Sequence, residues 1–304
     1  SFIVPQALIS LRPCDNFWPD NSIVLKRAMV TVVATLSETS YPSFVPSVSS
    51  ISTHFPTINA APSITPIPTI VPTSAISTYN GLKSALESDK SLILVNDIII
   101  FLNFVTIEDV QVKITSDDKG TTFDGTFSTS LLDLTKSSLT LEQLTIRRGY
   151  GLYFGCIRAT MSQISIFDSS LVNCTSEISG GFISLLSSTL VAVMSNFSSN
   201  NAVLGGVVYM NSNSKFTAVN SQFSANSAEV DGGVACVYDS STFTATNSSF
   251  DSNSAKDDGG VAYVRYSSTF TATNSIFESN LAADSGGVAV VADSSTFIAA
   301  NSAF

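Results

Sequence analysis

Few residues of this chain could carry acid–base chemistry. The only histidine, His54, lies in a stretch rich in proline. Arg147, Arg148 and Arg158 are close in sequence, but no catalytic motif that we recognise surrounds them. Elimination from a sugar acid needs a proton acceptor beside a cation, and glycoside hydrolysis needs two carboxylates about 5–10 Å apart. We therefore assign no catalytic residue, and a site in the less regular coils at 90–160, or in a part missing from this chain, is kept as the alternative.

Acidic residues recur at expected turns, 27 positions apart. Three columns of this kind are Asp231 with Asp258, Asp257 with Asp284, and Asp251 with Glu278. Stacked carboxylates repel one another, and Ca²⁺, which prefers oxygen ligands, could relieve that repulsion. Asp231, Asp257, Asp258 and Asp284 are thus the calcium candidates. The interpretation that we prefer is that aspartate favours turns and keeps the surface soluble, so that no cofactor is expected.

Three asparagines begin N-x-Ser/Thr sequons, which are glycosylation acceptors in secreted eukaryotic proteins: Asn173, Asn196 and Asn247. We expect Asn173 to align with the asparagines of an F-x-x-N repeat and Asn247 to lie in a turn column. Both side chains would then be engaged in hydrogen bonds between repeats. Asn196 falls at an outward strand position that other repeats fill with Gln, Ser or Ile, and it is the best acceptor of the three.

Composition narrows the class of partner. The 304 residues carry a net charge of -10, which argues against a nucleic-acid partner, because phosphate binding needs a basic face. Cys14, Cys156, Cys174 and Cys236 are far apart and suit neither a zinc site nor a disulfide-dense scaffold, so the redox compartment stays open. Cys236 shares a column with two tyrosines and a valine, which predicts a buried apolar position.

The chain divides into three segments. Residues 1–36 have no defined pattern, although residues 26–40 are signal-like or, equally, a buried strand. In residues 37–78, 24 of 42 are Ser, Thr or Pro, which predicts a linker that is open to O-glycosylation if secreted. Order is expected over 79–304. The chain begins with Ser and stops at Phe304 as a repeat begins, so we expect a piece of a longer protein.

The ordered segment begins with a short helix and continues in strands. Thr78 or Asn80 could cap a helix that buries Leu82, Ala85 and Leu86. Short apolar runs follow, and residues 135–149 alternate leucine and isoleucine with polar residues at the period of two that marks a half-buried strand. No run of 18 apolar residues occurs.

Repeats of about 27 residues, starting near residue 155, are the strongest signal. Paired glycines fall at 180–181, 205–206, 232–233, 259–260 and 286–287. One phenylalanine column holds Phe197, Phe223, Phe250, Phe277 and Phe304, and a second holds Phe216, Phe243, Phe270 and Phe297. One asparagine column holds Asn200, Asn226, Asn253 and Asn280, and a second holds Asn220, Asn247, Asn274 and Asn301.

The repeat composition predicts an all-β stack. A leucine-rich horseshoe is excluded because Leu281 is the one leucine between 205 and 304. Each unit instead offers three short strands, GGVAYV, STFTATN and SIFES, separated by turns. Three strands and three turns predict one coil of a right-handed, single-stranded parallel β-helix, with coils about 4.8 Å apart. Phenylalanine would fill the interior, asparagine would bond between coils, and glycine would permit tight bends.

F-x-x-N followed by GGV or GGF resembles the repeats of polymorphic outer membrane proteins of the chlamydial type, over residues 155–304. This chain departs from them by having Val or Phe where those repeats favour Ala. The resemblance implies a pectin-lyase-like β-helix, display at a cell surface or secretion, and adhesion. We therefore expect a non-enzymatic repeat protein that presents rigid polar faces to a protein or glycan, attached to a membrane only through parts outside this chain. The alternative is a carbohydrate-active enzyme: a lyase, hydrolase or epimerase.

Overall fold

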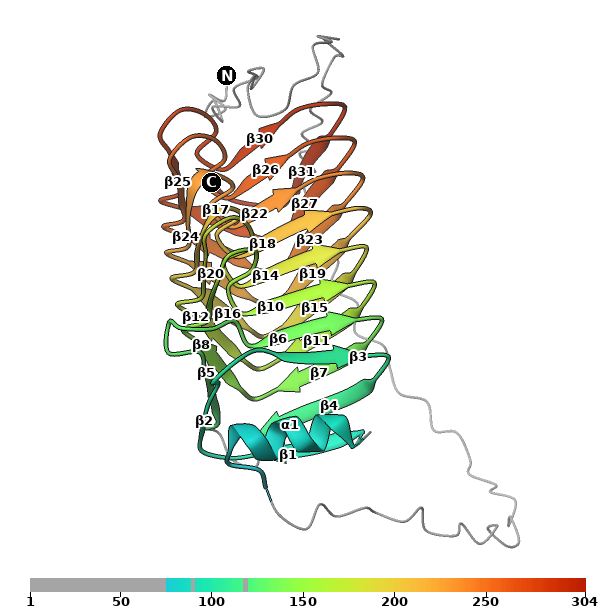
Figure 1. The fold of residues 1–304 in the computed structure, drawn as a ribbon. Coiled ribbons are helices and arrows are strands. Elements are labelled where there is room, and N and C mark those ends of the chain that lie inside the picture. Colours follow the sequence, from blue (N-terminus) through green and yellow to red (C-terminus); the bar gives the residue numbers. More distant parts are fainter. Residues whose placement is uncertain (1–74, 89–90, 117–119) are drawn as a thin grey trace, which may run out of the picture.

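Short strands stack in parallel, one coil above the next, in the computed structural model of the chain (Figure 1). The structure describes residues 75–88, 91–116 and 120–304. Within them, sheets of nine, eight, eight and six strands run along the stack, so the described part makes between eight and nine coils. The architecture is a parallel β-helix with one short helix, as the repeats predict. Its right-handedness stays a prediction.

Three long sheets form the faces of the stack. Sheet 1 contains β1 (Leu92–Val95), β4 (Gln111–Ser116), β7 (Ser138–Glu142), β11 (Gln163–Phe167), β15 (Thr189–Val193), β19 (Lys215–Val219), β23 (Thr242–Thr246), β27 (Thr269–Thr273) and β31 (Thr296–Ala300). Sheet 2 contains β2 (Ile98–Ile100), β5 (Thr122–Asp124), β8 (Thr145–Arg147), β12 (Ser170–Val172), β16 (Asn196–Ser198), β20 (Gln222–Ser224), β24 (Ser249–Asp251) and β28 (Ile276–Glu278). Sheet 3 contains β3 (Val105–Glu108), β6 (Leu132–Thr135), β10 (Ile157–Thr160), β14 (Ile183–Leu186), β18 (Val208–Asn211), β22 (Ala235–Val237), β26 (Ala262–Val264) and β30 (Ala289–Val291).

The predicted strand triplet matches these faces, since GGVAYV, STFTATN and SIFES contain β26, β27 and β28. A fourth, shorter sheet was not predicted. It lies between sheets 2 and 3 along the chain and contains β9 (Tyr150–Gly151), β13 (Thr175–Ser176), β17 (Asn201–Leu204), β21 (Ser227–Asp231), β25 (Ser254–Ala255) and β29 (Leu281–Ala282). Most of these strands have only two residues, too few to show a periodicity of their own.

Helix α1 (Tyr79–Glu87) lies across the β1 end of the stack (Figure 1). Thr78 is its N-cap, because its side-chain oxygen accepts a hydrogen bond from the Gly81 N–H at 3.1 Å. Leu82, Ala85 and Leu86 are buried against the core, as predicted. The helix thereby covers the open end of the interior, which a solenoid otherwise leaves in contact with water.

In the C-terminal coils the interior holds two columns of phenylalanine rings, whereas the core of the earlier coils is mainly leucine, isoleucine and valine. Phe243 stacks on Phe216 and on Phe270, with ring centroids 4.7 Å apart in both pairs. The second column meets the first edge to face, for instance Phe250 with Phe270 at 6.1 Å. The predicted positions Phe197, Phe216, Phe223, Phe243, Phe250, Phe270, Phe277 and Phe297 are all buried. The aromatic columns are therefore the core of the C-terminal coils, as the sequence predicts.

Asparagines of the first column form a buried ladder. The Asn226 Nδ2 donates to Asn253 Oδ1 and to the Phe197 carbonyl, each at 3.0 Å. Its Oδ1 accepts from the backbone N–H and the Nδ2 of Asn200. The side chain thus satisfies backbone groups that a turn would leave without partners. In this column the left-handed backbone angle falls one residue earlier, for example at Ala225. In the second column the asparagines themselves, Asn220 to Asn301, have φ of 49–50°.

Serine forms further ladders that the sequence interpretation missed. At the turn from sheet 3 to sheet 1, each backbone N–H donates to the serine Oγ of the next coil, as Ser241 does to Ser268 at 3.1 Å. That column holds Ser137, Ser162, Ser188, Ser214, Ser241, Ser268 and Ser295, all buried. The turn from sheet 1 to sheet 2 repeats the arrangement over Ser195, Ser221, Ser248, Ser275 and Ser302.

Paired glycines answer two different constraints. The first of each pair has φ between 66° and 70°, a left-handed conformation that side chains rarely adopt. The second lies against the next coil, since a Cβ on Gly206 would lie 2.2 Å from the Gly233 carbonyl oxygen. Both findings match the predicted tight bends.

Several predictions lie outside the described residues. They are the undefined segment 1–36, the signal-like stretch 26–40, and His54 and Cys14. Of the linker predicted at 37–78, only residues 75–78 are described, and there Ile76 bridges Val95 of β1. The domain boundaries stay predictions.

Replacing a stacked ring should destabilise the solenoid. Phe243→Ala removes a buried ring held between two neighbours, and it should lower the free energy of unfolding by about 3–5 kcal/mol. Chemical denaturation followed by circular dichroism would measure the loss. Thr244→Ala, which changes the outward-facing neighbour on β23, should cost no more than about 0.5 kcal/mol. Equal losses for the two variants would contradict the interior placement of the ring.

Candidate interaction surface

Opposite charges pair across neighbouring coils near the N-terminal end of the stack. In sheet 2, Asp124 of β5 lies beside Arg147 of β8. In sheet 3, Asp133 of β6 lies beside Arg158 of β10. The residues next to both aspartates in sequence belong to the core, and strand alternation therefore puts these charged side chains on the outer face. An enzyme site within residues 90–160 would require such a combination of carboxylate and guanidinium groups from adjacent coils.

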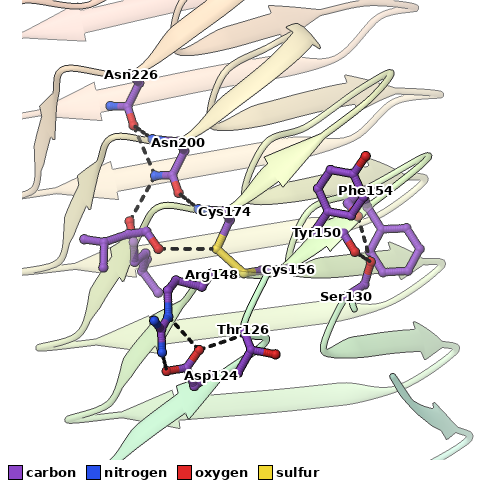
Figure 2. The surroundings of a disulfide bond; sticks show 12 residues. Asp124, Thr126, Ser130, Arg148, Tyr150, Phe154, Cys156, Cys174, Asn200 and Asn226 are labelled. Carbon is purple, nitrogen blue, oxygen red and sulfur yellow. Dashed lines mark hydrogen bonds and ion pairs between the residues drawn. A yellow bond between two sulfur atoms is a disulfide. The ribbon is translucent and has the colours of Figure 1, made fainter. Parts of the chain in front are cut away.

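Asp124 is saturated with hydrogen bonds (Figure 2). It accepts from Arg148 Nε and from the Thr126 N–H, as Figure 2 shows, and from Arg147 Nε, each at 2.9 Å. Burial alone would raise the pKa of this carboxyl, but the bonds from Arg148, Thr126 and Arg147 together hold the pKa below its usual value. Its side chain is only 1% exposed. The carboxylate is thus an ionised structural partner with no free lone pair directed at solvent.

Asp133 is engaged in the same manner. Arg158 Nε donates to its carboxylate at 2.8 Å, and a second bond comes from the other end of the guanidinium group. That bidentate bond raises the pKa of Arg158. The guanidinium carbon also lies 5.1 Å from the centre of the Phe154 ring, within the range of a cation–π contact.

A disulfide joins Cys156, directly before β10, to Cys174, just after β12 of the same coil (Figure 2). Sequence analysis did not predict it. Cys174 takes the column position of the ladder asparagines, and its N–H donates to Asn200 Oδ1 at 3.0 Å. In the coil below, Gly149 leaves room for the bond, since a Cβ there would lie 2.4 Å from the Cys156 sulfur. The disulfide therefore closes the asparagine ladder and fixes the segment 148–156 to the stack.

Exposed apolar side chains gather on the connections between sheets 2 and 3 of the first coils. We call this surface the aromatic corner and define it as Leu102, Phe104, Phe127, Tyr150, Leu152 and Tyr153, which are 36–75% exposed. The connections lie over one another, since the Phe101 N–H donates to the Asp124 carbonyl and the Tyr150 N–H to the Thr129 carbonyl. Monomeric proteins seldom expose contiguous apolar surface without a binding role.

Two shallow polar grooves follow other turns. The groove at the turn from sheet 1 to sheet 2 is lined by Gln143, Asp168, Asn196, Asn220 and Gln222, among others.

The groove at the turn from sheet 3 to sheet 1 contains Asp239, Tyr266 and Asp293 among serines. Arg265 Nε bonds Asp293 at 2.6 Å, and its guanidinium carbon lies 4.8 Å from the centre of the Tyr266 ring. Asp239 and Asp293 are two coils apart, which separates their backbones by about 10 Å.

The calcium candidates are distributed along the turns. Asp231 and Asp258 occupy equivalent places before the glycine pairs, since their carbonyls accept from Gly205 and Gly232. The Asp284 N–H donates to the Asp257 carbonyl of the coil below. Among the described residues, no group of three or more His, Cys, Asp or Glu is placed to hold a metal ion.

The pKa of Asp231 is strongly changed. Burial, and then the nearby charge of Asp258, raise its pKa to about 7. The side chain belongs to β21 and is buried beside the glycine pair. A carboxyl that is neutral under mildly acidic conditions suits a buried turn, because only its ionised form carries the full cost of desolvation.

The sequons have different surroundings. Asn196 pairs with Gln222 at the predicted outward position, and its Oδ1 has no hydrogen-bond partner. Asn247 accepts a bond from Asn274 Nδ2 at 3.2 Å, as predicted. The expectation for Asn173 is wrong: the register places it beside Ser199, and Cys174 beside Asn200. Leu171 lies beside Phe197, so the ladder position three residues later is filled by Cys174 and not by Asn173. Glycosylation of any sequon stays a prediction.

Cys236 is buried, as its column predicts. It packs with Tyr263 and Val290 beneath Tyr209 and Tyr238 on the outer side of sheet 3. Burial raises the pKa of its thiol well above the usual value, so the reactive thiolate is disfavoured.

Sequence reasoning missed the two ion pairs, the disulfide and the aromatic corner. A signal existed for the pairs: Asp124 and Arg147 are 23 residues apart, and Asp133 and Arg158 are 25 apart, close to one coil. Opposite charges at nearly one period are what cross-strand pairing would produce. The irregular coil length in this region hides that register.

No protein-family model matches this chain, and no curated protein matches it. Within the described part of the chain, we find no helix with the length and apolar character to cross a membrane.

Asp231 makes the solenoid less stable as the pH rises. Its folded-state pKa of about 7 exceeds the usual value of 3.8, so its stabilising contribution is complete below about pH 4 and is lost as the pH rises through 7. Asp231→Asn should flatten this dependence and, at pH 8, be more stable than the parent by roughly 2–4 kcal/mol. Denaturation at pH 5 and pH 8 measures both effects. Asp251→Asn, a change at an exposed position of β24, is the control, and parallel pH profiles for parent and Asp231→Asn would contradict the assignment.

Proposed function

We propose that this chain is a non-enzymatic, surface-exposed or secreted β-helix that acts as a rigid rod in adhesion or as a structural element. It presents polar faces and one apolar surface to a protein or glycan partner. The observation that carries this proposal is the state of the carboxylates in the irregular coils. Asp124 and Asp133 are 1% and 9% exposed and are bonded to arginines, so neither offers a substrate an acid or a base.

The regular coils support a mechanical role. Each residue of β23 lies beside its equivalent in β27, and the same parallel register continues to β31. Outward positions on this face are mainly threonine, for example Thr244 and Thr271. Ladders of identical residues make each coil a template for the next, which gives length and stiffness without a cleft.

The resemblance of F-x-x-N and GGV to the repeats of polymorphic outer membrane proteins supports display at a surface. Both motifs have a structural role in this fold, because the asparagines form a hydrogen-bonded ladder and the glycines permit the bend. The disulfide between Cys156 and Cys174 also supports an oxidising compartment, because such bonds persist mainly outside the cytosol. The proposed location is therefore extracellular or on the cell surface, which would be the outer membrane in a bacterium.

A carbohydrate-active enzyme is the second candidate, favoured by the groove between sheets 3 and 1. Asp239 and Asp293 flank Tyr266 there, and their separation of two coils is close to the about 6.5–9.5 Å between the carboxyl groups of inverting glycosidases. Asp293 is already bonded to Arg265, however, so one of the two carboxylates is engaged.

Turnover and binding measured in the same samples separate the two candidates. The intact chain would be incubated with neutral and uronic-acid polysaccharides, and new reducing ends and unsaturated sugars would be assayed alongside co-sedimentation. We expect no turnover. Turnover that is abolished by Asp239→Asn or Asp293→Asn and kept by Asp251→Asn would contradict the non-enzymatic proposal and support the enzyme.

A further inference from the structure

We propose that the aromatic corner is the site at which this rod binds its partner, and that the partner is a protein segment carrying Asp or Glu beside apolar side chains. This inference rests on the proposed binding function and names its site and its ligand class.

The corner has the composition of a binding surface. Its six side chains belong to three consecutive connections between sheets 2 and 3, at 101–104, 125–131 and 148–156. Phe104 reaches across to Phe154, with ring centroids 6.5 Å apart. Tyrosine, phenylalanine and arginine are the residues enriched in the buried centres of protein interfaces.

The corner is held rigid before any partner arrives. Ser130 Oγ donates to the Phe154 carbonyl at 2.9 Å, and Ser184 Oγ donates to the Tyr153 carbonyl at 3.0 Å. The Cys156–Cys174 bond anchors the end of the same segment (Figure 2). A side chain on an ordered backbone loses less conformational entropy on binding than one on a free loop.

Charge selects the partner. Arg147, Arg148 and Arg158 are 35–38% exposed, whereas the two aspartates that they bind are buried beneath them. Counted with Asp124, Asp133 and Glu177, the three guanidinium groups leave no net charge, but they are far more exposed than the two aspartates that they bind. Arg148 lies 5.9 Å from the centre of the Phe127 ring, so cation and apolar surface adjoin.

One further acid lies at this surface. Glu177 accepts a bond from the Tyr150 hydroxyl, so its carboxylate is engaged at the tyrosine. A partner carboxylate would therefore bind at Arg148, which adjoins Phe127, or at Arg158, which adjoins Phe154, in an otherwise acidic chain of net charge -10.

A protein fits better than a glycan. Leu102 and Leu152 are among the exposed side chains of the corner, and branched aliphatic groups offer no flat face on which a sugar ring can stack. Mixed aliphatic and aromatic side chains instead match the apolar anchors of a peptide.

The test selects peptides from a random dodecapeptide display library on the intact chain and measures their affinity by fluorescence polarisation. We expect selected peptides to be rich in Asp or Glu with Leu, Phe or Tyr. The triple variant Phe127→Ala/Leu152→Ala/Tyr153→Ala should bind them at least about tenfold more weakly. Binding to the parent should weaken as salt rises from about 0.1 M to about 1 M.

Tyr266→Ala is the matched control, because Tyr266 is also an exposed aromatic side chain beneath an arginine, at a turn remote in sequence from the corner. It should leave the affinity unchanged, and circular dichroism should show that both variants keep the parent fold.

Three outcomes would overturn the inference: selected peptides rich in Lys or Arg, affinity equally reduced by Tyr266→Ala, or no peptide that distinguishes parent from triple variant. Binding of a polysaccharide that only the triple variant loses would place a glycan at the corner and reject the protein partner. Any of these results, if no polysaccharide is turned over, would leave the proposal of a non-enzymatic rod intact. Turnover of a polysaccharide would contradict that proposal.

Discussion

Register between coils is the constraint on which the molecule depends. The hydrogen bonds of every long sheet run between coils, so each residue must lie over its counterpart one turn away. A slip of one residue would send the whole inward set to the solvent face. The stacked phenylalanines enforce the register from inside, because Phe243 has a ring above and below it at 4.7 Å and has no alternative partner of its size on the outward face.

Polar ladders complete that constraint at the bends. Where the chain turns between sheets, the backbone N–H groups point along the stack, and asparagine or serine of the next coil accepts from them. Identical polar residues at each level therefore replace the water that a buried turn would need. The regular coils are rich in serine and asparagine for this structural reason, and the glycine pairs mark a bend at which a side chain would collide with the neighbouring coil.

The regular coils could be predicted from the sequence because identical residues lie over one another in successive coils. Phe223, Phe250 and Phe277 recur at one spacing, and their common environment can be inferred from the recurrence alone. The candidate surface could not be predicted in this way. Asp124 and Arg147 pair because their charges are opposite. Cys156 and Cys174 form their disulfide beside a bend of irregular length. Self-similarity reveals columns of identical residues, whereas complementary pairs become visible only when the register is known.

The two halves of the stack thus differ in the side chains that they expose. The repeats supply length, and the irregular coils supply charged and apolar side chains on an anchored segment. Both depend on the register, which paired cysteines on the outer face of sheet 1 would test most directly. In Thr244→Cys/Thr271→Cys the two positions lie side by side in adjacent coils, so a disulfide should form on mild oxidation and appear in peptide mass spectrometry. The displaced pair Thr244→Cys/Thr273→Cys should remain reduced, and preferential linkage of that displaced pair would contradict the register on which the account depends.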